Sequence, residues 1–97
     1  MFRHVVLFSW KPESTDEQRL ALAEQLRKLP GVISTIRRYH LGPDVAVNTG
    51  NADFAVVAEF DDEAGYLVYR DDPEHRRIIA EYLRPIMASR TAVQFES

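Results

Sequence analysis

Cysteine is absent from this sequence of 97 residues. Without thiols the protein can form no disulfide, no zinc–thiolate site and no cysteine nucleophile. Long hydrophobic runs are also missing, so the sequence predicts no membrane-spanning helix. The segment Met1–Phe8 has only a short apolar run and no small-residue cleavage site, and it does not resemble a signal peptide. We therefore expect a cytoplasmic protein.

An excess of one charge is lacking as well. The formal net charge is −3, and acidic and basic residues are interspersed along the chain. Binding to nucleic acid or to an anionic membrane needs a basic patch, so we expect neither partner. The chain has no glycine-rich phosphate loop and no nucleophile elbow. Its histidines, His4, His40 and His75, lack the spacing of metal ligands, and we expect no metal site.

The composition and length are those of a small globular protein. Hydrophobic residues make up 45% of the chain and charged residues 28%, as in ordinary soluble proteins. A chain of this length forms one domain, residues 1–97, with no room for a second core. Because a small domain buries a modest fraction of its surface, pairing with a second copy would add stability.

Periodicity and capping residues predict the order of the elements. Strands are indicated by runs of β-branched and aromatic residues, and helices by caps followed by apolar residues at helical spacing. Ser14 and Glu17 have capping-box spacing at the start of the first helix. The predicted strands cover residues 2–11, 33–41, 53–60 and 91–96, and the predicted helices cover residues 14–29, 61–69 and 73–84.

This β-α-β-β-α-β order is that of the ferredoxin-like α+β plait, with four antiparallel strands and helices on one face. The first and third predicted strands are apolar on both faces, although one layer of helices covers only one. An apolar sheet face usually marks an interface, so we predict a homodimer that pairs sheet to sheet as an α/β barrel. The residues expected at this interface are Val5, Leu7, Ala55 and Val57.

The segment around His75 predicts a site. Asp72 is a good N-cap and Pro73 suits the first helical position, which places His75 in the first turn. Ile79 and Tyr82 continue the stripe of His75 at the i+4 and i+7 spacing of an amphipathic helix. A histidine there points toward the core or a cavity. It is either a core residue bonded to a backbone carbonyl or a base that accepts a proton from a substrate.

Other side chains are expected beside it. The phenol of Tyr69 would donate to a substrate oxygen, orient His75, or serve as a core aromatic. His4 shares a strand face with Val6 and Phe8, so it either lines the same space or is a satisfied strand histidine. The residues expected to line a ligand cavity between sheet and helices are His4, Val6, Phe8, Phe54, Ile79 and Tyr82.

Several features together resemble the stress-responsive dimeric α/β-barrel (Dabb) family. They are the opening Arg3–Pro12, the end of the third strand at Glu59–Asp62, the pair Pro73 and His75, and Leu83–Pro85 before the last strand. The similarity runs from end to end. It implies ferredoxin-like protomers that pair through their sheets.

The resemblance also implies possible functions. A plant subgroup of the family are polyketide cyclases, which close an aromatic ring by aldol condensation without metal or organic cofactor. Their catalytic tyrosine and histidine match Tyr69 and His75, and a cavity histidine matches His4. The sequence departs from that subgroup at Phe54, where the cyclases carry another histidine. Asp72 stands where many members have the first histidine of a His-Pro-x-His turn.

Three hypotheses follow. The protein is a cofactor-free, stress-response-type barrel that binds a small apolar or aromatic molecule. Alternatively, it is a cyclase-like enzyme in which His75 is the base and Tyr69 polarises a carbonyl. Alternatively, it is a structural stress protein that acts through its dimer.

Overall fold

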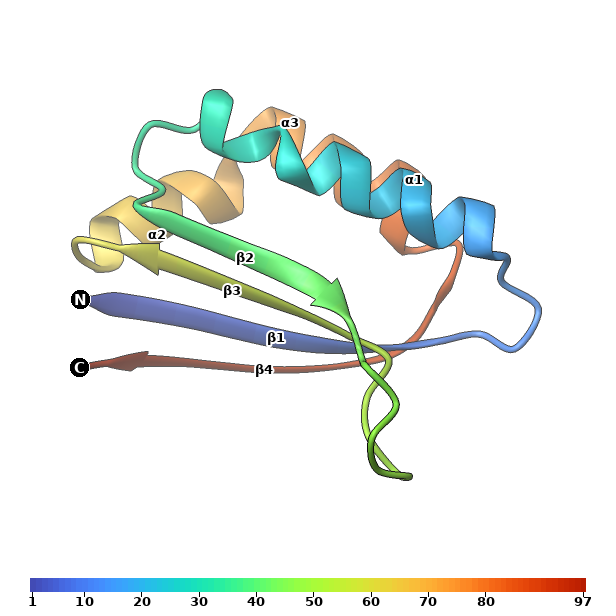
Figure 1. Ribbon diagram of the computed structural model, residues 1–97. Helices are drawn as coiled ribbons and strands as arrows, with labels where there is room; N and C mark the ends of the chain where they lie inside the picture. Colours follow the sequence, from blue (N-terminus) through green and yellow to red (C-terminus); the bar gives the residue numbers. More distant parts are fainter.

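Four antiparallel strands form one sheet, and every helix lies on the same side of it (Figure 1). The computed structural model, which describes residues 1–97, gives the strand order β2-β3-β1-β4. This is the predicted ferredoxin-like fold. Along the chain the elements are β1 (Phe2–Trp10), α1 (Asp16–Arg27), the 3-10 turn η1 (Leu29–Gly31), β2 (Arg38–Pro43), β3 (Phe54–Phe60), α2 (Glu63–Asp71), α3 (Pro73–Ile78), the π-helical turn η2 (Ile79–Leu83) and β4 (Met87–Glu96).

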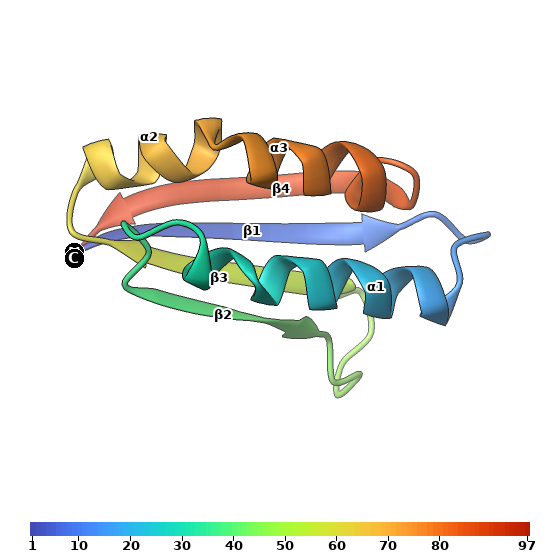
Figure 2. The same ribbon diagram turned by 90° about the horizontal axis from the view of Figure 1, so that it is seen from above.

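The core lies between the sheet and the helices. Central strands β1 and β3 are antiparallel, and Val6 lies opposite Val56 in their register. Because side chains alternate across a strand, these two residues face the helices while Val5 and Val57 face the other way. Seen from above, α1 and the α2–α3 pair lie side by side over the sheet (Figure 2). No helix is long and apolar enough to cross a membrane.

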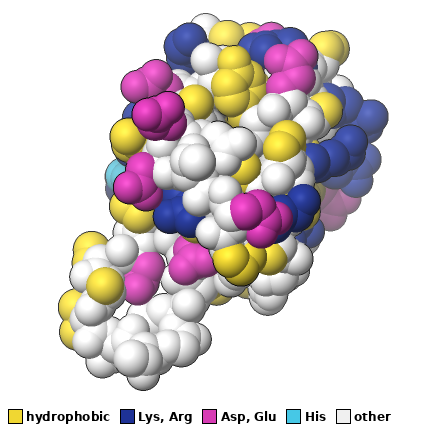
Figure 3. All heavy atoms as spheres, turned by 90° about the vertical axis from the view of Figure 1, so that its right-hand side faces the viewer, with side chains coloured by type: hydrophobic (Ala, Val, Ile, Leu, Met, Phe, Trp, Pro, Cys, Tyr) yellow, Lys and Arg dark blue, Asp and Glu magenta, His cyan; other side chains and the backbone are white.

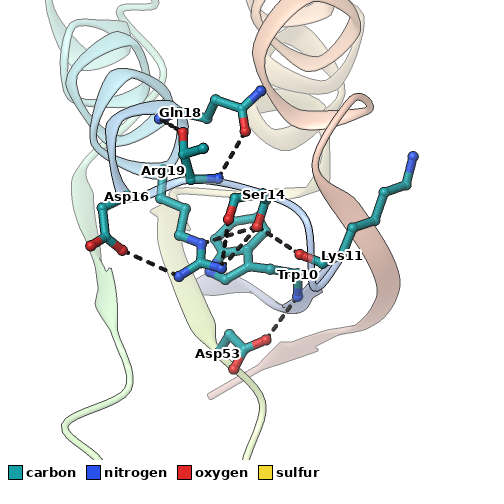
Figure 4. A network of polar contacts seen from close by, with 8 residues as sticks. Trp10, Lys11, Ser14, Asp16, Gln18, Arg19 and Asp53 are labelled. Carbon is teal, nitrogen blue, oxygen red and sulfur yellow. Dashed lines mark hydrogen bonds and ion pairs between the residues drawn. The ribbon is translucent and has the colours of Figure 1, made fainter.

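The N-cap of helix α1 lies one residue later than predicted. The cap is Thr15, whose hydroxyl accepts from the backbone N–H of Gln18 at 3.2 Å, while the Gln18 side chain accepts from the Thr15 N–H at 2.9 Å (Figure 4). The prediction of a Ser14–Glu17 capping box was therefore wrong. The Ser14 hydroxyl instead donates to the Lys11 carbonyl at 2.7 Å and accepts from Arg19.

Strand β2 also begins later than predicted. Residues 33–37 form turns rather than strand, and the buried Ile33 bonds back to Leu29 through its N–H. The β-branched residues that suggested a strand there serve as a core contact at the end of the helix. The strand instead extends through Gly42 and Pro43, which were expected in the following loop. It lies at an edge of the sheet.

Strand β4 begins at Met87 rather than at Thr91. The additional residues do not alternate between apolar and polar, but they pair with β1, with Arg90 opposite Phe8. Pairing with a neighbouring strand thus outweighs weak local propensity. Before β4, the helix that begins at Pro73 ends in the π-helical turn η2, where the Arg84 N–H bonds to the Ile79 carbonyl at 2.9 Å. Pro85, which has no N–H, follows directly.

The sheet face opposite the helices carries no other element of the chain. We name it the uncovered face and define it by Val5, Leu7, Ala55 and Val57, together with Val93 and Phe95 of β4. The loop of residues 44–52 extends beyond this face and stands away from the body of the protein (Figures 1 and 3). Its Val45 and Val47 side chains are 82% and 78% exposed.

Candidate functional site

A cavity of about 280 Å³ lies between the helix-facing side of the sheet and the helices. β1 contributes His4, Val6 and Phe8, and α2 and α3 contribute Tyr69 and His75. The remaining lining residues are Leu26, Val56, Tyr66, Arg70, Ile79, Leu83, Arg84, Met87 and Arg90. The walls are therefore mostly apolar, with a few polar groups directed into them, which is the usual composition of a small-molecule site.

His75 is positioned by its own helix start. The Asp72 carboxylate accepts from the backbone N–H groups of Glu74 at 2.8 Å and His75 at 3.2 Å, as expected of an N-cap. The ring Nδ1 of His75 lies 3.2 Å from the carbonyl oxygen of Arg70. Because a carbonyl only accepts, Nδ1 carries the proton and Nε2 keeps its lone pair. Burial lowers the pKa of His75, which favours this neutral base.

Tyr69 lies against His75 and is almost fully buried. The two rings have centroids 4.2 Å apart, and the Tyr69 side chain is 3% exposed. Its hydroxyl lies 2.9 Å from that of Tyr39 on β2. Burial raises the pKa of Tyr69 to about 12 and raises that of Tyr39 as well, so both phenols stay protonated at neutral pH. Two hydroxyl protons share one mutual hydrogen bond, so one proton is left to donate to a ligand.

His4 provides a second imidazole, whose hydrogen-bonding pattern is opposite to that of His75. Its Nδ1 lies 2.8 Å from Nε2 of Gln94, the residue opposite it on β4. The amide nitrogen donates, so Nδ1 of His4 accepts and its Nε2 carries the proton. Burial, followed by the positive charge of Arg90 and the proximity of the His75 imidazole, lowers the pKa of His4 to about 4. The cavity is thus lined by two neutral imidazoles in opposite tautomers: Nε2 of His4 is a donor, and Nε2 of His75 is an acceptor.

The structure brings most of the expected site residues to one cavity, namely His4, Val6, Phe8, Tyr69, His75 and Ile79. Phe54 and Tyr82 do not line it. Phe54 packs beside Trp10, with ring centroids 5.5 Å apart. Tyr82 is displaced because a π-helical turn holds more residues than an α-helical one. The eighth residue after His75, Leu83, therefore returns to the cavity side in place of the seventh.

Sequence reasoning missed the polar partners and the arginines of this site. Tyr39 and Gln94 come from the two edge strands, and only the register shows which residues they meet. Arg90 lay outside the predicted last strand, so its inward direction could not be inferred from alternation. No group of three or more His, Asp or Glu side chains is arranged to hold a metal ion.

Comparison with known proteins gives one family. The sequence model of the stress responsive A/B barrel domain (Dabb) family matches residues 2–97. A dimeric ferredoxin-like protein of unknown function from Thermobifida fusca is 41% identical, with a TM-score of 0.91 over 99% of this chain and 90% of that chain. A dimeric ferredoxin-like protein of unknown function from Bacteroides fragilis is 29% identical, with a TM-score of 0.83 over 99% and 95%.

More distant structures share the fold. A hydroxynitrile lyase from Passiflora edulis is 15% identical, with a TM-score of 0.83 over 97% of this chain and 90% of that chain. At this identity the similarity shows the fold alone. No curated protein matches the sequence.

Proposed function

The chain belongs to the stress responsive A/B barrel domain family, and we propose that it is a homodimeric barrel that binds a small, largely apolar molecule beside His75. The observation that carries the proposal is the cavity of about 280 Å³ with polar groups of fixed direction in apolar walls. His4 supplies a donor, His75 an acceptor and Tyr69 a hydroxyl. Few, convergent polar groups orient a ligand, and the apolar walls supply most of the binding free energy.

The uncovered face supports pairing with a second copy. Val5, Leu7, Ala55 and Val57 share that face with Val93 and Phe95, of which Val93 is 53% exposed. A continuous apolar patch of this kind is costly in water and usually marks an interface. The relatives from T. fusca and B. fragilis are both described as dimeric. We propose that the partner's equivalent face covers it about a two-fold axis.

Proton transfer is the second candidate function, because the tautomer of His75 favours it. Nε2 of His75 would take a proton from a carbon between two carbonyls, and the Tyr69 hydroxyl would hydrogen-bond the resulting enolate oxygen. The enolate carbon would then bond to the carbon of a third carbonyl, farther along the same molecule. The new alkoxide would take the proton back from His75, which closes a ring with no net change in atoms. An enzyme, the P. edulis hydroxynitrile lyase, has the same fold.

A thermal-unfolding screen tests the binding proposal. The probes are an alkylphenol and an alkyl 1,3-diketone, and the proteins are wild type, His75→Gln and Tyr69→Phe. Tyr82→Phe is the matched control, because Tyr82 lies outside the cavity lining. A ligand at about 100 times its dissociation constant should stabilise a binding-competent protein by about 2.7 kcal/mol.

We expect wild type and Tyr82→Phe to be stabilised by at least one probe, and the two cavity variants to be stabilised less. Equal stabilisation of all four proteins would place binding elsewhere. Absence of stabilisation by every probe would contradict small-molecule binding and favour a protein that acts through its dimer. For the second candidate, the readout is exchange of the diketone's central C–H protons with solvent deuterium. Exchange faster than the uncatalysed rate with wild type, and its loss in His75→Gln at saturating probe, would identify a proton-transfer enzyme.

A further inference from the structure

The charged residues that line the cavity are all of one sign. Arg70, Arg84 and Arg90 contribute to the lining, and no aspartate or glutamate does. His4, His75 and Tyr69 also line the cavity, and they are neutral because burial lowers the pKa of both histidines and raises that of Tyr69. The cavity of a protein with a net charge of −3 is therefore locally positive.

Two of these arginines have no acidic partner. Arg70 donates to the adjacent Asp71 carboxylate at 2.9 and 3.1 Å, so its charge is compensated within the protein. Arg84 and Arg90 take part in no ion pair, and their side chains donate no hydrogen bond to any protein group. Arg3, Arg19, Arg37, Arg76 and Arg77 are paired with carboxylates. Arg27 and Arg38 are also in no ion pair, but neither lines the cavity.

The position of Arg90 directs its charge toward the site. It lies opposite Phe8 in the register of β1 and β4, and Phe8 is a cavity residue, so both side chains lie on the helix-facing side of the sheet. After burial, which is the main cause of each shift, the positive charge of Arg90 also contributes to the lowered pKa values of His4 and His75, which places both imidazoles within its field. Arg84 reaches the same cavity from the end of η2.

Both side chains belong to exposed residues, so they lie where the cavity meets solvent. Basic side chains gather on the side of the molecule where α3 and β4 lie (Figures 2 and 3). An unpaired guanidinium beside an apolar cavity gains a charge-assisted hydrogen bond from an anion that arrives with the ligand.

We propose that the molecule bound here carries a carboxylate, held by Arg84 and Arg90, while its apolar body lies in the cavity against Val6, Ile79 and Leu83. This inference rests on the proposed function and defines the class of its ligand. The planar guanidinium donates two parallel hydrogen bonds to a carboxylate, which fixes orientation as well as charge. A volume of about 280 Å³ lies near the lower end of small-molecule sites and suits a substituted aromatic or short-chain acid.

Isothermal titration calorimetry with matched probes tests this assignment. The probes are 4-butylbenzoate, the neutral isostere 4-butylbenzamide, and 4-butylphenyl phosphate. Titrations at pH 8 keep His4 and His75 neutral, since their pKa values lie below 6.5. The proteins are wild type, Arg90→Gln, Arg84→Gln/Arg90→Gln, and the control Arg27→Gln. Arg27 is exposed at the end of α1 and lies outside the cavity lining.

We expect wild type and Arg27→Gln to bind the acid at least about tenfold more tightly than the amide, as a charge-assisted contact provides. Arg90→Gln should lose most of that preference and the double variant all of it, with amide binding unchanged. Equal binding of acid and amide by wild type would overturn the carboxylate and leave the cavity as a binding site. Tighter binding of the phosphate would overturn it in favour of a phosphorylated ligand. Failure of both acid and amide to bind would overturn this inference and the proposed function together.

Discussion

The hydroxyl groups of Tyr39 and Tyr69 lie 2.9 Å apart and connect the edge strand β2 to helix α2. Tyr69 in turn lies against His75, with ring centroids 4.2 Å apart. Tyr39 is therefore a positioning residue. It fixes the phenol that would face the ligand without lining the cavity itself.

Removing both hydroxyls of this pair should destabilise the protein by less than the sum of the two single removals. In Tyr39→Phe the buried Tyr69 hydroxyl loses its partner, and we expect a loss of about 1–3 kcal/mol in the free energy of unfolding. Tyr69→Phe should cost a similar amount. The double variant should cost less than the sum, because two apolar groups then face each other. Urea denaturation of the four proteins measures the coupling, and strictly additive losses would show that the hydroxyls do not interact.

The cap of α3 should affect stability and ligand binding together. Asp72→Ala removes the acceptor of the Glu74 and His75 N–H groups and should cost about 1 kcal/mol of stability. Because the first turn also positions the His75 ring, binding of the best probe from the thermal screen should weaken. Asp72→Asn, which keeps a capping oxygen, is the matched control and should preserve both properties. Full binding by Asp72→Ala at reduced stability would separate the cap from the site.

Local sequence signals predicted the fold but only some of the residues of the candidate site. Asp72 and Pro73 place His75 in a first turn by local rules alone, and β1 shows its two apolar faces in its own residues. Three features depend on distant partners instead. The Tyr39–Tyr69 contact needs the β2–β3 register, Arg90 faces inward only through pairing with β1, and Leu83 replaces Tyr82 because a π-helical turn shifts the stripe.

A charged residue introduced on the uncovered face should dissociate the proposed dimer. Val57→Asp places a carboxylate at the centre of that face, opposite Val5. Burying it without a partner would cost several kcal/mol, so we expect a monomer at micromolar concentration. Val68→Asp is the matched control, because Val68 is 52% exposed on α2, away from the sheet. Light scattering after size-exclusion chromatography gives the masses. A dimer that survives Val57→Asp, or a monomeric wild type, would contradict sheet-to-sheet pairing.

The buried histidines should make the protein less stable in mild acid. The pKa of His4 falls from 6.5 to about 4 on folding, chiefly because burial disfavours its charged form, and burial lowers that of His75 in the same direction. Between these values the unfolded chain binds protons that the folded protein does not. Stability is therefore full above pH 6.5 and declines as the pH falls toward 4. After allowance for solvent screening, His4 should contribute on the order of 2 kcal/mol to this loss.

Urea denaturation from pH 8 to pH 5 measures this decline in stability. Protonation of the carboxylates in ion pairs does not contribute in this range, because it occurs at lower pH. The pKa of Asp71, for example, is lowered to about 2 by its bonds to Arg70 and Arg76. His4→Gln removes the main titrating group but keeps an acceptor for the Gln94 amide, so its stability should change less over the same range. The remaining slope belongs to His75 and should disappear in His4→Gln/His75→Gln. A wild-type stability that is flat from pH 8 to pH 5, or a slope that persists in the double variant, would show that these imidazoles are not held neutral by the fold. In that case His75 would be charged near pH 6 and unable to act as a base there.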